Sequence, residues 1–310
     1  MSPALALDND YNQALAEGWL PIREVSRRTG VNPVTLRAWE RRYGLVVPHR
    51  TPKGHRLYSA EHLARIESVL TWLNRGVPVS QVKVLLEAPA ERLRQRSENE
   101  WQPMCQHLIT AVAELAERKL DDKLNQAMAL YPPSTLCEQL LMPLLRELEL
   151  RWQGQPGSAA QRIFFLSWLR SKLGARVYHN NRQVSGKPAP PINQSDLPME
   201  PALWITAWLI SSADCPVEVF DSALPPGELA ATAALLEARA TVLYSSRPIS
   251  VERLAIQVEG AGHVLLAGPC VEIHRSELAM HTSLSSLPLA SAPWMPTNSF
   301  KRPTFSKGFA

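Results

Sequence analysis

Residues 31–58 have the sequence VNPVTLRAWERRYGLVVPHRTPKGHRLY, and this stretch decides the fold of the N-terminal part of the chain. Asn32 and Pro33 supply a helix N-cap followed by proline at the first helical position. Gly44 stands where glycine commonly ends a helix. Two short segments with apolar residues then flank a basic loop at residues 50–55. The stretch therefore predicts a short basic helix, a glycine stop and a basic hairpin loop.

Positive charge is concentrated around this stretch. The 310-residue chain has a formal net charge of +4, yet residues 21–83 hold 12 Lys and Arg against 4 Asp and Glu, a net charge of +8. Residues 1–20 carry −3 and residues 84–310 carry −1. A basic block of this kind is typical of proteins that bind polyanions. A solvated basic surface is the alternative that charge alone leaves open.

A helical wheel of 100° per residue separates two faces of the predicted helix. Leu36, Trp39 and Tyr43 fall together on a packing face. The opposite face carries arginines, which bind guanine edges or phosphates, and small side chains, which contact thymine methyl groups. This pattern favours a helix-turn-helix in the major groove of DNA, with the basic loop on phosphates or in an adjacent minor groove. The side chains expected to face DNA are Val34, Thr35, Arg37, Ala38, Arg41 and Arg42 on the helix, and Arg50, Lys53, His55 and Arg56 on the loop.

The rest of the chain divides by periodicity and composition into a mainly α architecture. Four long amphipathic segments with short breaks predict an antiparallel bundle. A proline-rich stretch follows, which is either a linker or a poorly formed first strand. The predicted domains are a flexible N-terminus at 1–20, a winged helix-turn-helix at 21–88, a helical bundle at 91–182, a linker at 183–199, a small α/β module at 200–275 and a disordered tail at 276–310.

The α/β module is predicted from alternating short β-rich runs and helical segments, which favour a small parallel sheet with flanking helices. The strands are expected at 217–220, 241–244 and 264–266, and the helices at 203–210, 228–238 and 251–259.

Composition argues against several other classes of protein. The four cysteines, Cys105, Cys137, Cys215 and Cys270, form no CxxC pair, which disfavours a disulfide framework or a thiolate metal site. Neither a signal peptide nor an apolar run of about 18 residues is present, so no membrane contact is expected. No nucleophile or phosphate-loop motif stands in its required context. We therefore expect a cytoplasmic, nucleoid-associated protein that is not an enzyme.

Three motifs resemble the MerR-type winged helix-turn-helix, in the branch that contains the regulators MlrA, CarH and LitR. They are PVTLRAWERRYGL at 33–45, GHRLY at 54–58 and GVPVSQVKVLL at 76–86. The resemblance implies that Arg37, Arg41 and Tyr43 contact DNA from the recognition helix, and that Arg50, Lys53 and Arg56 do so from the wing. Tyr58, which ends the second motif, is expected in the same surface. The helical bundle and the α/β module resemble a cobalamin-binding domain.

The motifs that hold cobalamin in this branch are missing from the chain. An Asp-x-His-x-x-Gly loop is expected after the first strand of the α/β module, but residues 192–199 have an Asp and no His. A Trp followed after nine residues by Glu-His is expected in the bundle, but counting from Trp152 reaches Arg162 and Ile163. His263 is a poor replacement, because it precedes an apparent strand. We therefore expect a degenerate domain without cobalamin, other cofactor or metal.

These observations predict a sequence-specific transcription regulator that binds double-stranded DNA. The resemblance implies an inverted-repeat promoter site, a homodimer or higher homo-oligomer, and an indirect effect on RNA polymerase. Two alternatives remain: a cobalamin- or small-molecule-responsive sensor-regulator, and a regulator controlled by docking of a partner photoreceptor protein. Trp168, Trp204 and Trp208 would line a ligand pocket under the first alternative, but aromatic residues at helical spacing are more often core.

Overall fold

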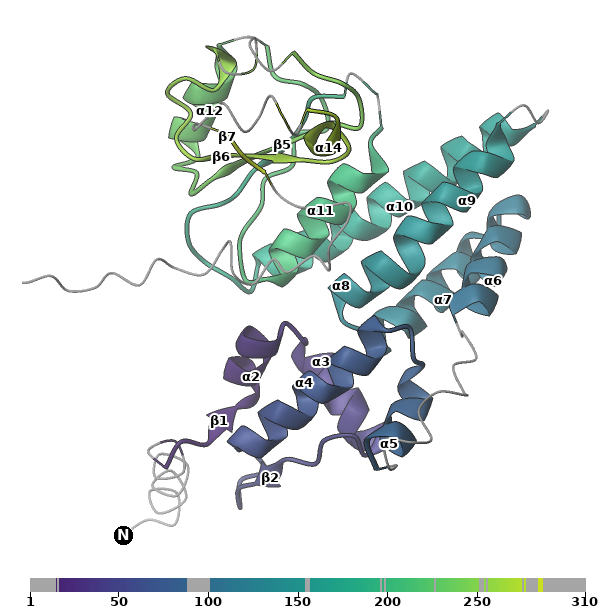
Figure 1. Cartoon of the computed structure of the whole chain (residues 1–310), viewed down its shortest axis with the longest axis vertical. Helices are drawn as coiled ribbons and strands as arrows, with labels where there is room; N and C mark the ends of the chain where they lie inside the picture. Colours follow the sequence, from purple (N-terminus) through teal and green to yellow (C-terminus); the bar gives the residue numbers. More distant parts are fainter. Residues whose placement is uncertain are drawn as a thin grey trace, which may run out of the picture. The chain divides into compact units, whose positions relative to one another are not determined.

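Figure 1 shows the computed structural model of the chain, which describes residues 15, 17–87, 101–153, 157–195, 197, 199–225, 227–250, 254, 256–274, 276 and 284–286. The chain forms two compact units, Met1–Phe165 and Leu166–Ala310, and the division falls within helix α10 (Ser158–Asn181). Within the described ranges, every helix is too short or too polar to span a membrane.

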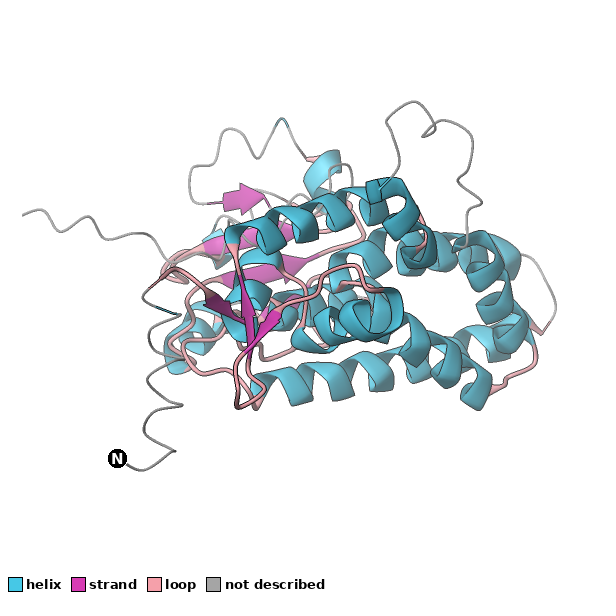
Figure 2. Ribbon diagram, turned by 90° about the horizontal axis from the view of Figure 1, so that it is seen from below, coloured by secondary structure: helices cyan, strands magenta, loops and turns pink. Residues whose placement is uncertain are grey.

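The first unit begins with a small antiparallel sheet (Figure 2). Its strands are β1 (Leu20–Pro21), β2 (His49–Arg50) and β3 (Arg56–Tyr58), in the order β1-β3-β2. The loop between β2 and β3 closes through the Gly54 amide, which donates a 2.7 Å hydrogen bond to the Thr51 carbonyl, and Gly54 has a φ of +82°. A left-handed backbone at this position explains the glycine. The predicted hairpin is confirmed, with its first strand at 49–50.

Two helices connected by a tight turn follow β1. Helix α2 (Ile22–Thr29) ends at Gly30, and α3 (Pro33–Ala38) starts where the Asn32 side chain accepts a 2.8 Å hydrogen bond from the Thr35 amide. The helix continues for one π-helical turn, η1 (Trp39–Tyr43), and stops at the left-handed Gly44. The predicted cap at Asn32 and the glycine stop at Gly44 are confirmed. The change to π-helical geometry was not predicted, and it alters which side chains share a face beyond Ala38.

The remaining helices of the first unit are α4 (Ala60–Asn74), α5 (Val79–Glu87), α6 (Trp101–Ala113), α7 (Glu117–Leu130), α8 (Pro133–Leu136), η3 (Cys137–Leu141) and α9 (Met142–Trp152), followed by the start of α10. Helix α6 packs on α7 and α9, and its neighbours contribute Leu120, Leu124, Leu140 and Leu144 to a buried apolar core. Because α8, η3 and α9 are contiguous, they form one long helix of the predicted bundle.

The second unit contains a parallel sheet in the order β4-β5-β6-β7. The strands are β4 (Pro191–Asn193), β5 (Thr241–Tyr244), β6 (Val264–Ala267) and β7 (Leu284–Ser286), and the described helices of this unit besides α10 are α11 (Pro201–Ser212), α12 (Glu228–Leu235) and α14 (Cys270–Ile273). All four residues of β5 and of β6 are buried, as expected of a parallel sheet covered on both faces.

Three expectations for the second unit need correction. The assignment of residues 183–199 as a linker is wrong, and the alternative of a poorly formed first strand is confirmed, because the stretch contains β4, whose three residues are buried and paired with β5. The segment predicted as a disordered tail contains β7, which pairs with β6. The strand predicted at 217–220 is reduced to one bridge between Ile192 and Phe220. The helix predicted at 251–259 lies partly outside the described residues, and most of the two ends of the chain lies outside them. Short strands rich in proline gave too weak a periodic signal to be separated from loops.

Candidate DNA interface and effector module

Four of the side chains predicted to face DNA lie on the exposed side of the continuous helix formed by α3 and η1. Val34, Arg37, Arg41 and Arg42 are exposed, and Val34 retains 58% of its accessible surface. An apolar side chain so exposed between arginines suits contact with a thymine methyl group. The Arg41 Nε donates to the Arg37 backbone carbonyl at 3.4 Å, which directs the Arg41 side chain back along the helix. These four side chains are therefore accessible at the surface of the helix.

Three residues that were predicted to face DNA are buried, so the prediction is wrong for them. Thr35, Ala38 and Tyr58 retain 0%, 5% and 1% of their accessible surface. Helix α7 packs against α3, and a wheel of one helix cannot anticipate a neighbour from a segment 80 residues later. Tyr58 lies in β3, where burial raises the pKa of its hydroxyl to about 12. These three residues support the interface from within and do not form its surface.

The wing is attached to the recognition helix through Glu40. Arg50 and Arg56 both donate to the Glu40 carboxylate, each at 2.6 Å. Burial alone would raise the pKa of Glu40, but the hydrogen bonds from Arg56 and Arg50 outweigh it and the pKa is lowered. Arg56 is largely enclosed in this contact, whereas Arg50, Lys53 and His55 are exposed. The carboxylate therefore fixes the wing beside the helix.

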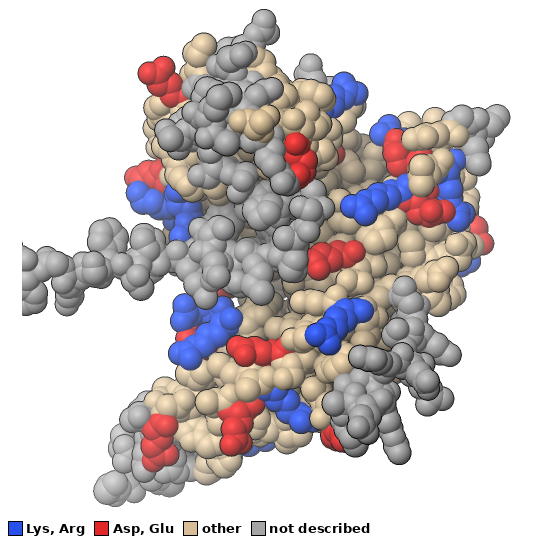
Figure 3. Space-filling view, viewed as in Figure 1, with Lys and Arg blue, Asp and Glu red and all other residues tan. Residues whose placement is uncertain are grey.

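Glu40 is the residue of this region that sequence reasoning missed. The basic block of residues 21–83 holds only 4 acidic residues, and Glu40 is the one placed within the arginine-rich helix. An acid in that position is a usable signal, because an isolated carboxylate among cations forms strong charge-assisted hydrogen bonds. The face in Figure 3 shows acidic as well as basic side chains over α2 and α4.

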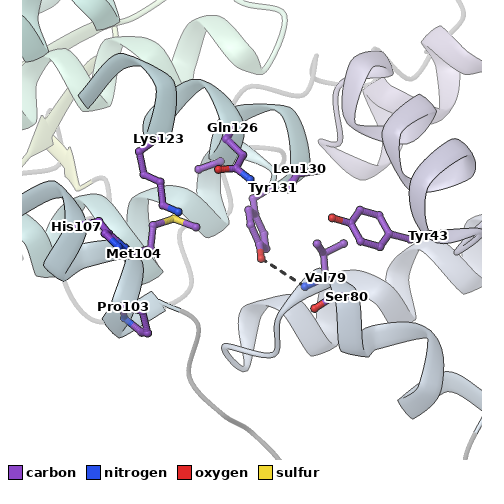
Figure 4. A pocket seen from close by; sticks show the side chains of 11 residues that line it. Tyr43, Val79, Ser80, Pro103, Met104, His107, Lys123, Gln126, Leu130 and Tyr131 are labelled. Atoms are coloured by element: carbon purple, nitrogen blue, oxygen red, sulfur yellow. Dashed lines mark hydrogen bonds between the residues drawn. The ribbon is translucent and has the colours of Figure 1, made fainter. Parts of the chain in front are cut away.

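The bundle contacts the recognition helix directly. The Trp39 indole donates a 2.8 Å hydrogen bond to the Leu130 carbonyl at the end of α7. The Tyr131 hydroxyl accepts a 3.4 Å hydrogen bond from the Val79 amide at the start of α5, and Thr135 donates to Asn74 at 2.9 Å. Tyr43, predicted to contact DNA, is half-buried and lines a cavity next to α7 (Figure 4). The DNA-facing helix and the bundle thus belong to one packed unit.

Open parallel sheets bind ligands at the carboxyl ends of their strands. In the second unit this edge follows β4, β5 and β6. Here that edge is occupied by polar groups that pair with one another. The side-chain amide of Asn193 donates to the backbone carbonyls of Leu197 and Asp221 at 3.0 and 2.7 Å. The Ser246 amide donates to the Ser195 hydroxyl at 3.0 Å, and the Ser246 hydroxyl donates to the buried Glu200 at 2.6 Å.

His263 and the three tryptophans considered as ligand-pocket residues lie in different places. His263 lies away from this edge, Trp168 and Trp208 lie within the core, and Trp204 is half-buried. His263 is exposed and immediately precedes β6, so it lies at the amino edge of the sheet. Trp168 and Trp208 are buried, and the Trp204 indole donates to the Asp221 carboxylate at 2.6 Å. In the first unit, Trp152 is buried and tilted against Phe165, with 6.1 Å between ring centroids.

The comparisons with known proteins agree with this geometry. Residues 20–89 match the model of the MerR HTH family of regulatory proteins, and residues 104–176 match a B12 binding domain. The HTH-type transcriptional regulator MlrA of Salmonella typhimurium is 32% identical over 203 residues, which cover 66% of this chain and 80% of MlrA. The chain belongs to the MerR family of transcription regulators.

Two further relatives place this MerR regulator in the same branch. MlrA of Escherichia coli is 31% identical over 66% of this chain and 80% of its own length. The HTH-type transcriptional repressor CarH of Myxococcus xanthus is 27% identical over 51% of this chain and 56% of its own length. The MerR regulator therefore combines a DNA-binding helix-turn-helix with a domain that resembles the B12-binding domain, as the sequence predicted.

Proposed function

We propose that this MerR regulator binds an inverted-repeat promoter site as a homodimer or higher homo-oligomer. Arg37 and Arg41 read base edges in the major groove, and Val34 and Arg42 lie on either side of them. Arg50, Lys53 and His55 contact phosphates from the wing. The single observation that carries the proposal is the exposure of Arg37 and Arg41 on one helix whose neighbouring wing is held in place by Glu40.

The buried residues have supporting roles in this proposal. Arg56 is enclosed against Glu40, so it positions the wing. Thr35, Ala38 and Tyr58 hold the helix and the strand against their neighbours. The regulator acts on RNA polymerase indirectly, through the promoter DNA that it binds, and works in the cytoplasm where that DNA is accessible.

We also propose that the effector module works without cobalamin. The stretch 192–199 offers no imidazole to ligate cobalt. The buried Asn193, Ser195 and Glu200 are hydrogen-bonded to groups of the protein itself at the carboxyl edge of the sheet. A Cβ on Gly268 would lie 2.5 Å from the Ser245 carbonyl, so this glycine already serves close packing of the protein's own chain. The residues present do not fit the cofactor.

The experiment that tests the DNA-binding proposal is selection of duplexes from a random pool by the purified full-length protein. We expect enrichment of an inverted repeat, because a symmetric dimer presents two identical reading helices. Sedimentation of the protein with one selected duplex then gives the number of protomers per site. A pool that stays random after repeated rounds, or one protomer on each selected duplex, would contradict the proposal.

A further inference from the structure

A cavity of about 310 Å³ lies in the first unit, where the helix-turn-helix meets the bundle. One wall comes from the end of η1 and the start of α5, with Tyr43 and Val79; the opposite wall comes from α6 and α7, with Met104 and Lys123. Tyr131 lies between the two walls and is hydrogen-bonded to the Val79 amide (Figure 4). The volume equals that of about ten water molecules, which is at the lower end of the range for small-molecule sites.

The lining of this junction cavity is cationic on one side and apolar on the other. Lys123 and His107 are the ionisable basic groups, and no Asp or Glu is among the described lining residues. In the described part of the chain, Lys123 is half-buried and pairs with no carboxylate. Met104, Val79 and Leu130 supply apolar surface, and Figure 4 shows Lys123, Met104 and His107 gathered on the wall opposite Tyr43. A partly desolvated cation without a partner favours an anionic ligand group.

The position of the cavity connects it to the DNA-reading helix. In the packed arrangement the Trp39 indole is hydrogen-bonded to Leu130 and α3 packs against α7, while Arg37 and Arg41 stay exposed. A molecule that touches both walls would stabilise this arrangement further. Because DNA binds to the exposed arginines of the same arrangement, ligand and DNA favour the same state, and linkage makes the effect reciprocal.

We propose that the junction cavity binds a small organic carboxylate with an apolar body, and that its binding strengthens DNA binding. Lys123 holds the carboxylate, while Met104, Val79 and Leu130 contact the apolar part. The regulatory half of this inference rests on the DNA-binding function proposed above. The binding half does not, because it concerns a site that is complete without DNA.

Titration calorimetry of the full-length protein with benzoate tests the site, with neutral benzamide and inorganic phosphate as comparison probes at matched ionic strength. We expect benzoate to bind and the other two to bind at least about tenfold more weakly, since each lacks either the charge or the apolar body. Lys123→Gln should lower benzoate affinity by at least about tenfold, and Lys123→Arg should retain most of it. Lys119→Gln is the matched control, because Lys119 is on the same helix but pairs with Glu114.

The regulatory half is tested by titrating a selected duplex with and without saturating benzoate. We expect the affinity for DNA to rise at least about fivefold in the wild type and to stay unchanged in Lys123→Gln. Absent benzoate binding, equal binding of benzamide, or an equal loss in Lys119→Gln would overturn the site. The proposed regulation would be overturned if benzoate left the DNA affinity unchanged. It would also be overturned if Lys123→Gln weakened DNA binding without any probe, because Lys123 would then be a phosphate contact. If the protein binds no DNA at all, the proposed function fails while calorimetry still reports on the cavity.

Discussion

The indole Nε1 of Trp39 donates a 2.8 Å hydrogen bond to the carbonyl oxygen of Leu130, 91 residues further along the chain. Trp39 is fully buried and ends the regular α-helical part of the recognition helix, and Leu130 ends α7. The bond therefore connects the element that faces DNA with the helical bundle. A change in the bundle has a direct structural route to the recognition helix.

Replacing Trp39 with Phe should lower the free energy of unfolding by about 1–3 kcal/mol, because the buried Leu130 carbonyl loses its donor while most of the apolar contact is kept. Chemical denaturation followed by circular dichroism measures the change. Trp72→Phe is the control, since Trp72 is only half-buried and lies in α4. Equal losses in the two variants would show that the Trp39 hydrogen bond contributes nothing specific.

The contribution of Glu40 to stability should depend on pH. Its pKa is lowered in the folded protein from the ordinary value of 4.5, so the carboxylate stabilises the fold above that value. The stabilisation is lost as the pH falls from 4.5 through the lowered pKa. Compared with Glu40→Gln, the wild type should thus be more stable near neutral pH, and the difference should shrink below pH 4.5. A difference independent of pH from neutral to strongly acidic conditions is the result that would exclude this role.

Lys53 of the wing should contribute to DNA affinity without contributing to sequence preference. Lys53→Ala is expected to weaken binding to selected and unselected duplexes by similar factors and to reduce the salt dependence by about one unit of slope, as loss of one phosphate contact does. Fluorescence anisotropy at several salt concentrations gives both quantities. Arg118→Ala is the control, because Arg118 is an exposed residue at the start of α7. A loss confined to the selected duplex would mean that Lys53 reads bases.

Gly268 should tolerate a methyl group far less well than Gly262. Both have a left-handed backbone, with φ of +94° and +72°, so alanine is conformationally strained at either position. Only at Gly268 would the new Cβ meet other atoms, at 2.5 Å from the Ser245 carbonyl. Gly268→Ala should therefore be less stable than Gly262→Ala by about 1–3 kcal/mol, the cost of overpacking. Thermal unfolding of the two variants measures this difference. Equal unfolding midpoints would show that the Ser245 carbonyl does not restrict the space at Gly268.

Adding hydroxocobalamin in excess should leave the protein colourless after gel filtration. The reason is the missing imidazole in residues 192–199 together with the internal pairing of Asn193, Ser195 and Glu200. The visible absorbance of the protein fraction is the measurement. Corrin absorbance that co-elutes with the protein at one equivalent would overturn the proposal that the module works without cobalamin.

Local chemistry allowed much of the first unit to be predicted. The Asn32 cap, the Gly44 stop and the hairpin around Gly54 each follow from backbone preferences of a few residues, and the structure confirms them. The burial of Ala38 was not predictable in this way, because it depends on α7 from a distant part of the sequence. The π-helical turn at Trp39–Tyr43 was also not predicted, because the helical wheel assumes the same rotation at every residue.

The second unit was harder to predict because its strands are short. The buried runs at β5 and β6 are continuous apolar segments and were found, whereas β4 begins with Pro191 inside a proline-rich stretch. Its place in the sheet is decided by pairing with β5, which is a contact between residues about 50 positions apart. Long-range pairing of this kind leaves no periodic signal in so short a strand.

The central claim is that Arg37 and Arg41 read DNA sequence. Equilibrium binding of the selected duplex by the wild type, Arg37→Ala and Arg41→Ala, each beside a scrambled duplex of equal length, tests it most directly. We predict that each substitution costs about 1–3 kcal/mol on the selected duplex and narrows the preference over the scrambled one. If both variants kept the full preference and lost affinity equally on the two duplexes, the arginines would be phosphate contacts only and the claim would be wrong.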